Sequence, residues 1–185
     1  MRGYVLIPPI AFSVFLLFTN TSAMLCSWWH PFWSTLSDLG RNYNHDSQII
    51  FNAGCWISGI LLSIGGVWKS LCEDGLNKAG GILLAIAGAG LFAVGFATGD
   101  YPQAHDIATA VLFIFALGAM ALITLDDVMN KDRLVLYSSL LIGLVMLIQW
   151  PLLYGGTQEL VMILGAAAWS MVQVYKYYKS GKLFE

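Results

Sequence analysis

The 185-residue chain is 58% hydrophobic and only 11% charged. A soluble domain is nearer half apolar and a quarter charged, so a soluble fold of this size could not bury so much apolar surface. The formal net charge of -2 also argues against nucleic acid as a partner, because such binding depends on clustered lysine and arginine. Composition therefore predicts an integral membrane protein.

Six stretches of the chain are long and apolar enough to cross a bilayer, which takes about 20 residues in a helix. The expected spans are residues 4–25, 47–71, 78–98, 105–125, 134–154 and 159–178. Lipid offers no partner to unpaired backbone groups, so each span must be helical. We expect an all-α integral membrane bundle of six transmembrane helices forming one domain over residues 1–185. Glycines in the second and third spans predict that these two helices pack closely.

The first span allows two interpretations. Arg2, the apolar run and the small residues 21–23 fit a cleavable signal peptide. The run is long for a signal sequence, however, and Pro8 and Pro9 stand near its start. We favour a retained span and keep cleavage as the alternative.

The positions of lysine and arginine set the expected orientation. With the N-terminus inside, every basic residue except Arg41 falls on the inner side, and this bias governs membrane insertion. The inner basic residues are Arg2, Lys69, Lys78, Lys131, Arg133, Lys176, Lys179 and Lys182. We therefore expect a multi-pass protein of the cell membrane with both termini cytoplasmic. The acids beside these residues are interpreted as solvated loop charges: Glu73, Asp74, Asp126, Asp127 and Asp132.

The first outer loop, residues 26–46, is the longest polar interval of the chain. It holds His30 and His45, and the third histidine, His105, opens the fourth span on the same side. Its tryptophans fit the aromatic belt of a membrane interface: Trp28, Trp29 and Trp33. All the histidines and several acids are therefore expected on the outer face.

Polar side chains on this outer side form the candidate binding site. The candidate ligand-binding residues are Ser37, Asp38, Arg41, Asn52, Asp100, His105 and Asp106. Helix capping and the helix dipole explain Asp100 and Asp106 without a site, but they explain His105 less well. Asn52 lies about one and a half turns into the second span. An amide at that depth either bonds a neighbouring helix or lines a wet cavity.

Three interpretations of the outer polar groups stay open. In the first, they are ordinary surface residues and caps. In the second, four side chains form an ion-pair network that fixes the outer loop onto the bundle: Asp38, Arg41, His105 and Asp106. In the third, His30, His45 and His105 bind zinc together with a carboxylate, and the metal activates water. Spacing does not support the zinc centre, because neither HxxxH nor HExxH occurs.

The cysteines Cys26, Cys55 and Cys72 show no metal-binding spacing. We expect them to be small buried side chains. A disulfide between Cys26 and Cys55 is the alternative if both lie near the outer face.

Three short motifs carry a resemblance to a known family. They are Leu36–Gly40 after the first span, Ile50–Gly54 in the second, and Gly99–Pro102 followed by His105 at the fourth. On these motifs the chain resembles the uncharacterised prokaryotic family of multi-span membrane proteins called domain of unknown function nine-nine-eight, often labelled "hypothetical membrane protein". The resemblance implies a helical membrane fold and draws attention to five residues, but it implies no activity. These residues are Ser37, Asp38, Asn52, Asp100 and His105.

Two broader resemblances are weaker. The layout of spans is similar to that of six-span eukaryotic proteins linked to membrane stress, autophagy and lipid organisation. The chain also resembles alkaline-ceramidase-like hydrolases, which use histidines, an aspartate and a serine around zinc. This sequence departs from those hydrolases because no histidine lies in its last span, and this departure puts an amide-hydrolase activity in doubt.

These observations predict an integral membrane protein that binds a lipid headgroup or a membrane partner in an outward-facing polar pocket. The pocket would be walled by Trp28, Trp29 and Trp33. A metal-dependent membrane lipid hydrolase or transferase is the first alternative. A small-solute transporter is the second, although polar groups in the middle of the spans are few. Membrane lipids are the expected partners, and a homo-oligomer or a membrane-protein partner stays open.

Overall fold

The structure is a computed structural model that describes residues 2–129, 133–149, 151–181 and 183. Within these residues the chain is helical and contains no strand. The elements are the 3-10 helices η1 (Gly3–Leu6) and η2 (Leu36–Gly40) and the α-helices α1 (Ile7–Met24), α2 (His45–Cys72), α3 (Gly75–Val94), α4 (Pro102–Met129), α5 (Arg133–Ile148) and α6 (Gly155–Lys179).

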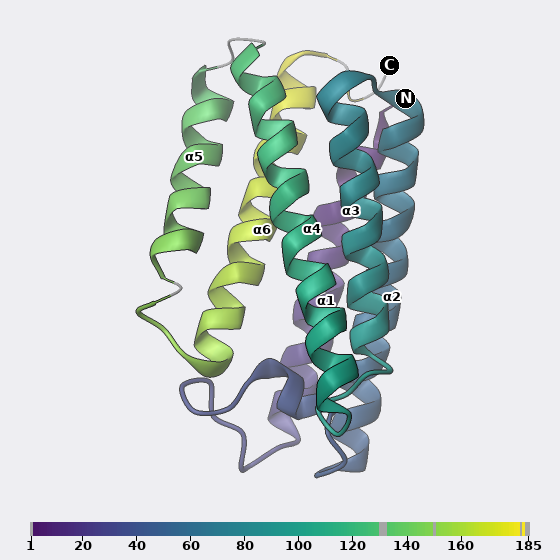
Figure 1. Cartoon of the computed structure of the whole chain (residues 1–185), viewed down its shortest axis with the longest axis vertical. Coiled ribbons are helices and arrows are strands. Elements are labelled where there is room, and N and C mark those ends of the chain that lie inside the picture. Colours follow the sequence, from purple (N-terminus) through teal and green to yellow (C-terminus); the bar gives the residue numbers. More distant parts are fainter. Residues whose placement is uncertain (1, 130–132, 150, 182, 184–185) are drawn as a thin grey trace.

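The helices run side by side along the long axis of a bundle (Figure 1). Both chain ends lie at one end of the bundle, and the loop containing η2 crosses the opposite end. Among the described residues, five helices are long and apolar enough to span a bilayer, and α5 is a shorter apolar helix. The prediction of an all-helical, multi-pass membrane protein is therefore confirmed.

Three helices end away from the predicted boundaries, and the first of them, α3, ends at Val94 although the predicted span continues to Thr98. Helix α4 continues to Met129, beyond the predicted end at Leu125. Helix α5 ends at Ile148, whereas the predicted span continues to Tyr154. Pro151 accounts for the early end of α5, because proline has no N–H and its ring clashes with the preceding turn. Two basic residues used to predict the orientation, Lys131 and Lys182, lie outside the described residues, and so does Asp132, one of the acids interpreted as solvated.

The predicted close packing of the second and third spans is confirmed. A Cβ built on Gly59 of α2 would lie 2.5 Å from the backbone nitrogen of Phe92 and 2.7 Å from the carbonyl oxygen of Gly88, both on α3. Neither backbone atom can move aside, so only glycine lets the two helices approach this closely. The Ser63 hydroxyl adds a hydrogen bond of 3.1 Å to the Ala85 carbonyl.

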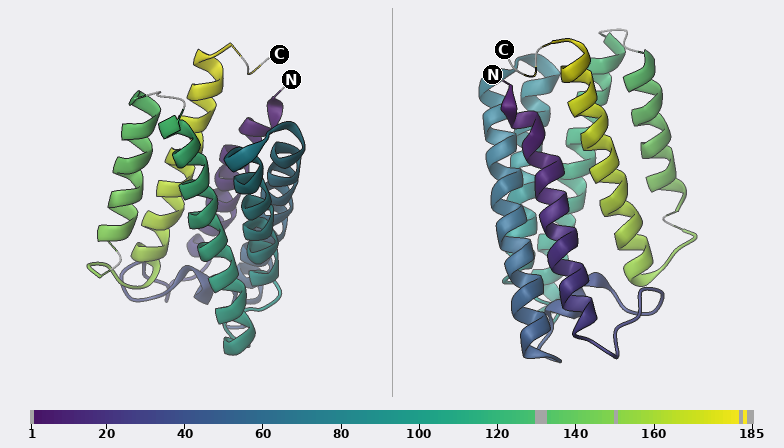
Figure 2. Two further views of the ribbon diagram at one scale, coloured as in Figure 1. Left: turned by 45° about the horizontal axis from the view of Figure 1, so that its top comes forward. Right: turned by 180° about the vertical axis from the view of Figure 1, so that it is seen from behind.

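The remaining helices are arranged around a looser centre. Helix α1 lies between α2 and α6, as the rear view in Figure 2 shows. Helix α5 packs mainly on α6 and more weakly on α4, at the edge of the bundle. Side chains of α4, α5 and α6, including Ile123, Met146 and Trp169, form one apolar core between them.

The interpretation of the inner acids as solvated loop charges is wrong for three of them. Asp127 is fully buried, where it accepts a hydrogen bond of 3.0 Å from the Gln173 amide and pairs with Lys176. Asp126 accepts a hydrogen bond of 2.5 Å from the Asn77 amide. The extension of α4 explains both cases, because it places these acids on a helix facing α3 and α6.

Glu73 is the third of these acids, and it is half-buried. Its carboxylate lies 2.9 Å from the Arg2 guanidinium and accepts hydrogen bonds from the Tyr4 and Tyr177 hydroxyls. Asp74 is exposed, as predicted. The end of the bundle that carries the termini is therefore closed by a buried network of paired charges.

Candidate functional site

The outer loop is fastened to the start of α6 by backbone hydrogen bonds. The Gly156 N–H donates to the Ser34 carbonyl at 2.5 Å, and the Thr157 N–H donates to the Pro31 carbonyl at 2.7 Å. The Thr157 hydroxyl donates to that same Pro31 oxygen at 2.8 Å. Thr157 therefore holds the loop instead of capping its own helix. The loop forms a lid over this end of the bundle.

Asp38 and Arg41 stabilise the lid from within. Asp38 and Thr35 form a capping box around η2, in which the Thr35 N–H donates to the Asp38 carboxylate at 2.7 Å. Arg41 Nε lies 2.9 Å from the other Asp38 carboxylate oxygen. Part of the predicted ion-pair network is therefore present. His105 makes its hydrogen bonds elsewhere, and Asp106 is exposed.

Asp100 fastens the lid to the turn between α3 and α4. Its carboxylate accepts a hydrogen bond of 3.1 Å from the Asn42 N–H and one of 3.2 Å from the Thr98 hydroxyl. A side chain at Gly99 would collide with the Arg41 guanidinium. Asp100 is therefore a positioning residue for the loop.

The motifs that carry the family resemblance meet at this end of the bundle. A Cβ on Gly40 would lie 2.7 Å from Asn52 Oδ1 and 2.9 Å from the Phe51 ring. Asn52 is buried, and its Oδ1 accepts no hydrogen bond from the described residues. The first motif thus packs directly on the second, and the absence of a side chain at Gly40 makes room for Asn52.

A cavity of about 100 Å³ lies beneath the lid. Its walls come from η2 and from all six α-helices, and its lining is apolar along most of its length. The polar side chains that line it belong to η2, α4 and the first turns of α6: Ser37, His105, Thr109 and Glu159. The cavity therefore has a polar end under the lid and an apolar body between the helices.

The imidazole of His105 is fixed by two contacts. Its Nδ1 lies 2.8 Å from the Ala97 carbonyl oxygen, which can only accept, so Nδ1 carries the proton. In the neutral ring Nε2 is then an acceptor, and the Thr109 hydroxyl approaches it at 3.4 Å. This contact is longer than an ordinary hydrogen bond, so Nε2 retains capacity for a stronger donor.

Thr109 and Glu159 line the polar end of the cavity but were not among the predicted site residues. One carboxylate oxygen accepts a hydrogen bond of 2.6 Å from the Leu36 N–H, which joins α6 to η2. An acid in the first turns of a helix is favoured by the helix dipole, so the sequence alone offers a sufficient local explanation of Glu159 without a cavity. The available signal was an isolated acid beginning an otherwise apolar span.

The predicted site residues therefore separate into groups. Ser37 and His105 line the cavity, whereas Asp38, Arg41 and Asp100 hold the lid. Asn52 is buried in the core beside Gly40, and Asp106 is exposed. The tryptophans expected to wall the site do not line this cavity: Trp28, Trp29 and Trp33.

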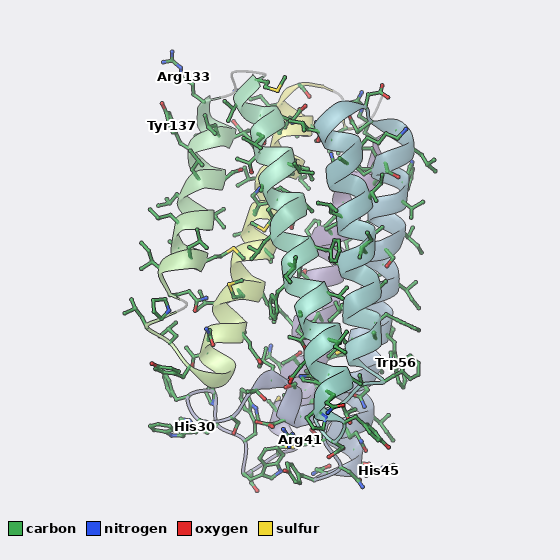
Figure 3. The ribbon with its side chains drawn as sticks, viewed as in Figure 1. His30, Arg41, His45, Trp56, Arg133 and Tyr137 are labelled. Atoms are coloured by element: carbon green, nitrogen blue, oxygen red, sulfur yellow. The ribbon has the colours of Figure 1, made fainter. Side chains whose placement is uncertain are left out.

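The zinc interpretation receives no support from the geometry. His30 and His45 are exposed and lie apart on the lid end (Figure 3), while His105 lines the cavity. In the part of the chain that the structure describes, no three His, Cys, Asp or Glu side chains gather as metal ligands do. Cys26 and Cys55 are free and buried, as expected, but Cys72 is exposed.

Comparison with known proteins gives one match. A family model described as "Protein of unknown function (DUF998)" matches residues 9–175. No curated protein and no solved structure matches the chain.

Proposed function

The chain belongs to the DUF998 family of proteins of unknown function, and on that premise we propose that it binds an amphiphilic membrane lipid. One observation carries the proposal: the cavity is polar at the lid end and apolar along its body. The headgroup would lie beside Ser37, His105 and Glu159. The hydrocarbon tail would lie between α1, α4 and α6.

The cavity extends along the bundle axis, as the site of a hydrocarbon chain would. Glu159 and Trp169 both line it from α6, and a helix rises about 1.5 Å per residue, which separates them by roughly 15 Å along the axis. Phe12 and Phe113 line the apolar body from α1 and α4. Contacts between a tail and these side chains would offset the loss of contacts with neighbouring lipids.

We also propose that the polar end faces outward and that both termini are cytoplasmic. Arg133 lies at the end that carries the termini, whereas Arg41 lies at the lid end (Figure 3). The remaining described lysines and Arg2 also lie at the end that carries the termini, as their positions in the chain show. Lysine and arginine favour the cytoplasmic side, which supports this orientation. A retained first span is part of the proposal, because α1 supplies Pro8, Phe12 and Phe15 to the cavity wall.

The alternatives receive less support. A metal-dependent hydrolase needs a ligand set, and the described histidines do not provide one. A small-solute transporter needs polar groups along its path, and the body of this cavity is apolar.

Filling the cavity tests the proposal. Ala116 of α4 lines the cavity, whereas Ala121 on the same helix is exposed on the outside of the bundle. Purified wild-type protein and Ala121→Phe should retain a co-purified lipid in native mass spectrometry. Ala116→Phe should lose most of it while remaining folded by circular dichroism. Equal lipid retention by both variants, or wild-type protein without lipid, would contradict lipid binding in this cavity.

A further inference from the structure

The polar end of the cavity presents hydrogen-bond acceptors. His105 uses its N–H on the Ala97 carbonyl and turns an accepting nitrogen toward Thr109. Glu159 accepts from the Leu36 N–H through one oxygen, and a carboxylate can accept at its second oxygen as well. The Ser37 backbone also bonds this carboxylate, so a ligand headgroup here meets the remaining acceptor sites of Glu159 and the weakly bonded Nε2 of His105.

The negative charge at this end has no cationic partner in the described structure. No described lysine or arginine forms a salt bridge with Glu159. Arg41 is paired with Asp38 and does not line the cavity. A carboxylate or phosphate headgroup would place like charge beside Glu159 in a poorly solvated site, which is unfavourable.

We propose that the cavity selects amphiphiles whose headgroup donates hydrogen bonds, as a hydroxyl or an ammonium group does, and discriminates against anionic headgroups. This inference rests on the proposed lipid-binding function. A hydroxyl can donate to the Glu159 carboxylate or to His105 Nε2. An ammonium group can do the same and also balance the charge of Glu159.

Three probes of one chain length test the selectivity: monolauroylglycerol, dodecylamine and lauric acid. Each competes against the co-purified lipid in native mass spectrometry, at a pH above neutrality where lauric acid is ionised. Wild-type protein should bind the glyceride, the amine or both at least about 10-fold more tightly than the acid, a difference of about 1.4 kcal/mol. Preference between the first two distinguishes a hydroxyl from an ammonium headgroup.

Two variants separate a site effect from general surface charge. Glu159→Gln keeps an acceptor for the Leu36 N–H but removes the charge, so the preference over lauric acid should fall to within about 3-fold, or about 0.7 kcal/mol. Asp106→Asn removes an exposed acid near the same end and should keep the wild-type preference.

The outcomes distinguish the two proposals. Lauric acid binding as tightly as the other probes, or an unchanged preference in Glu159→Gln, would overturn the headgroup inference alone. If none of the probes binds and the wild-type protein carries no lipid, the proposed function fails and the headgroup inference fails with it.

Discussion

The two ends of the bundle differ in the partners of their enclosed polar side chains. At the end with the termini, Glu73 is paired with Arg2, which precedes η1, and Asp127 is paired with Lys176 of α6. At the lid end, Glu159 accepts from a backbone N–H, and His105 donates to a backbone carbonyl. The first arrangement satisfies its own charges and joins the helices. The second leaves acceptors available, as a binding site requires.

The paired end is a continuous network. Lys69 is buried and donates a hydrogen bond of 2.8 Å to Asn77, whose amide in turn donates to Asp126. Lys69 also reaches the Tyr177 hydroxyl at 3.4 Å. These contacts connect α2, α3, α4 and α6, so removing one partner at this end should leave buried polar groups unpaired and destabilise the fold.

Removing Asp127 should produce the largest effect. Asp127→Ala leaves Lys176 and Gln173 without their buried partner. Breaking a buried pair in this way costs about 3 kcal/mol or more. Thermal unfolding of detergent-purified protein should show a clear loss of stability. Asp74→Ala, which removes an exposed acid nearby, is the control, and equal effects of both changes would refute the distinction between paired and solvated acids.

Acidification should weaken the same end through Glu73. Burial acts to raise the pKa of this carboxyl, but hydrogen bonds from tyrosine and nearby positive charges outweigh burial and hold the pKa below its ordinary value of 4.5. A group with a lowered folded-state pKa contributes stability above its unfolded pKa, and this contribution is lost as the pH falls through the folded value.

The free energy of unfolding in detergent should therefore decline as the pH falls below 4.5, the ordinary glutamate value. Glu73→Gln should flatten that decline, because glutamine does not titrate. Asp74→Asn should leave the decline unchanged. An identical pH profile for wild type and Glu73→Gln would show that Glu73 does not cause the acid sensitivity.

The matching change at the lid end should affect stability much less. Glu159→Gln preserves an oxygen that can accept from the Leu36 N–H, so the loss should stay below about 1 kcal/mol. Denaturation midpoints measured beside those of Asp127→Asn provide the comparison. A larger loss in Glu159→Gln would make Glu159 a structural residue and reverse the contrast between the two ends.

Removing Asp106 should have the smallest effect. The side chain is exposed and does not line the cavity, and such surface substitutions usually change stability by no more than about 0.5 kcal/mol. Asp106→Ala should retain both the co-purified lipid and the wild-type unfolding temperature. Loss of lipid in this variant would extend the site beyond the cavity.

The sequence was sufficient to predict the helices and the family. Long apolar stretches predict membrane-spanning helices directly. The motif containing Ser37 and the motif ending at His105 indicated the end of the bundle at which the polar part of the cavity lies. These signals are local, since each depends on the composition of one segment.

The roles of Glu159 and Asp127 could not be predicted in the same way. Both acids stand near helix ends, where solvation or the helix dipole offers a sufficient local explanation. Their true partners, Leu36 and Lys176, come from distant parts of the chain. Only the tertiary arrangement shows that these charges are enclosed.

The early end of α5 has a consequence for the surrounding bilayer. At about 1.5 Å per residue, Arg133–Ile148 is roughly 24 Å long, shorter than the hydrocarbon thickness of about 30 Å. A short helix is accommodated by local thinning of the membrane. Lipids beside a spanning α5 would therefore be deformed next to a helix whose Met146 lines the cavity, and under the proposed function this mismatch would lower the work of drawing one of them out of the leaflet.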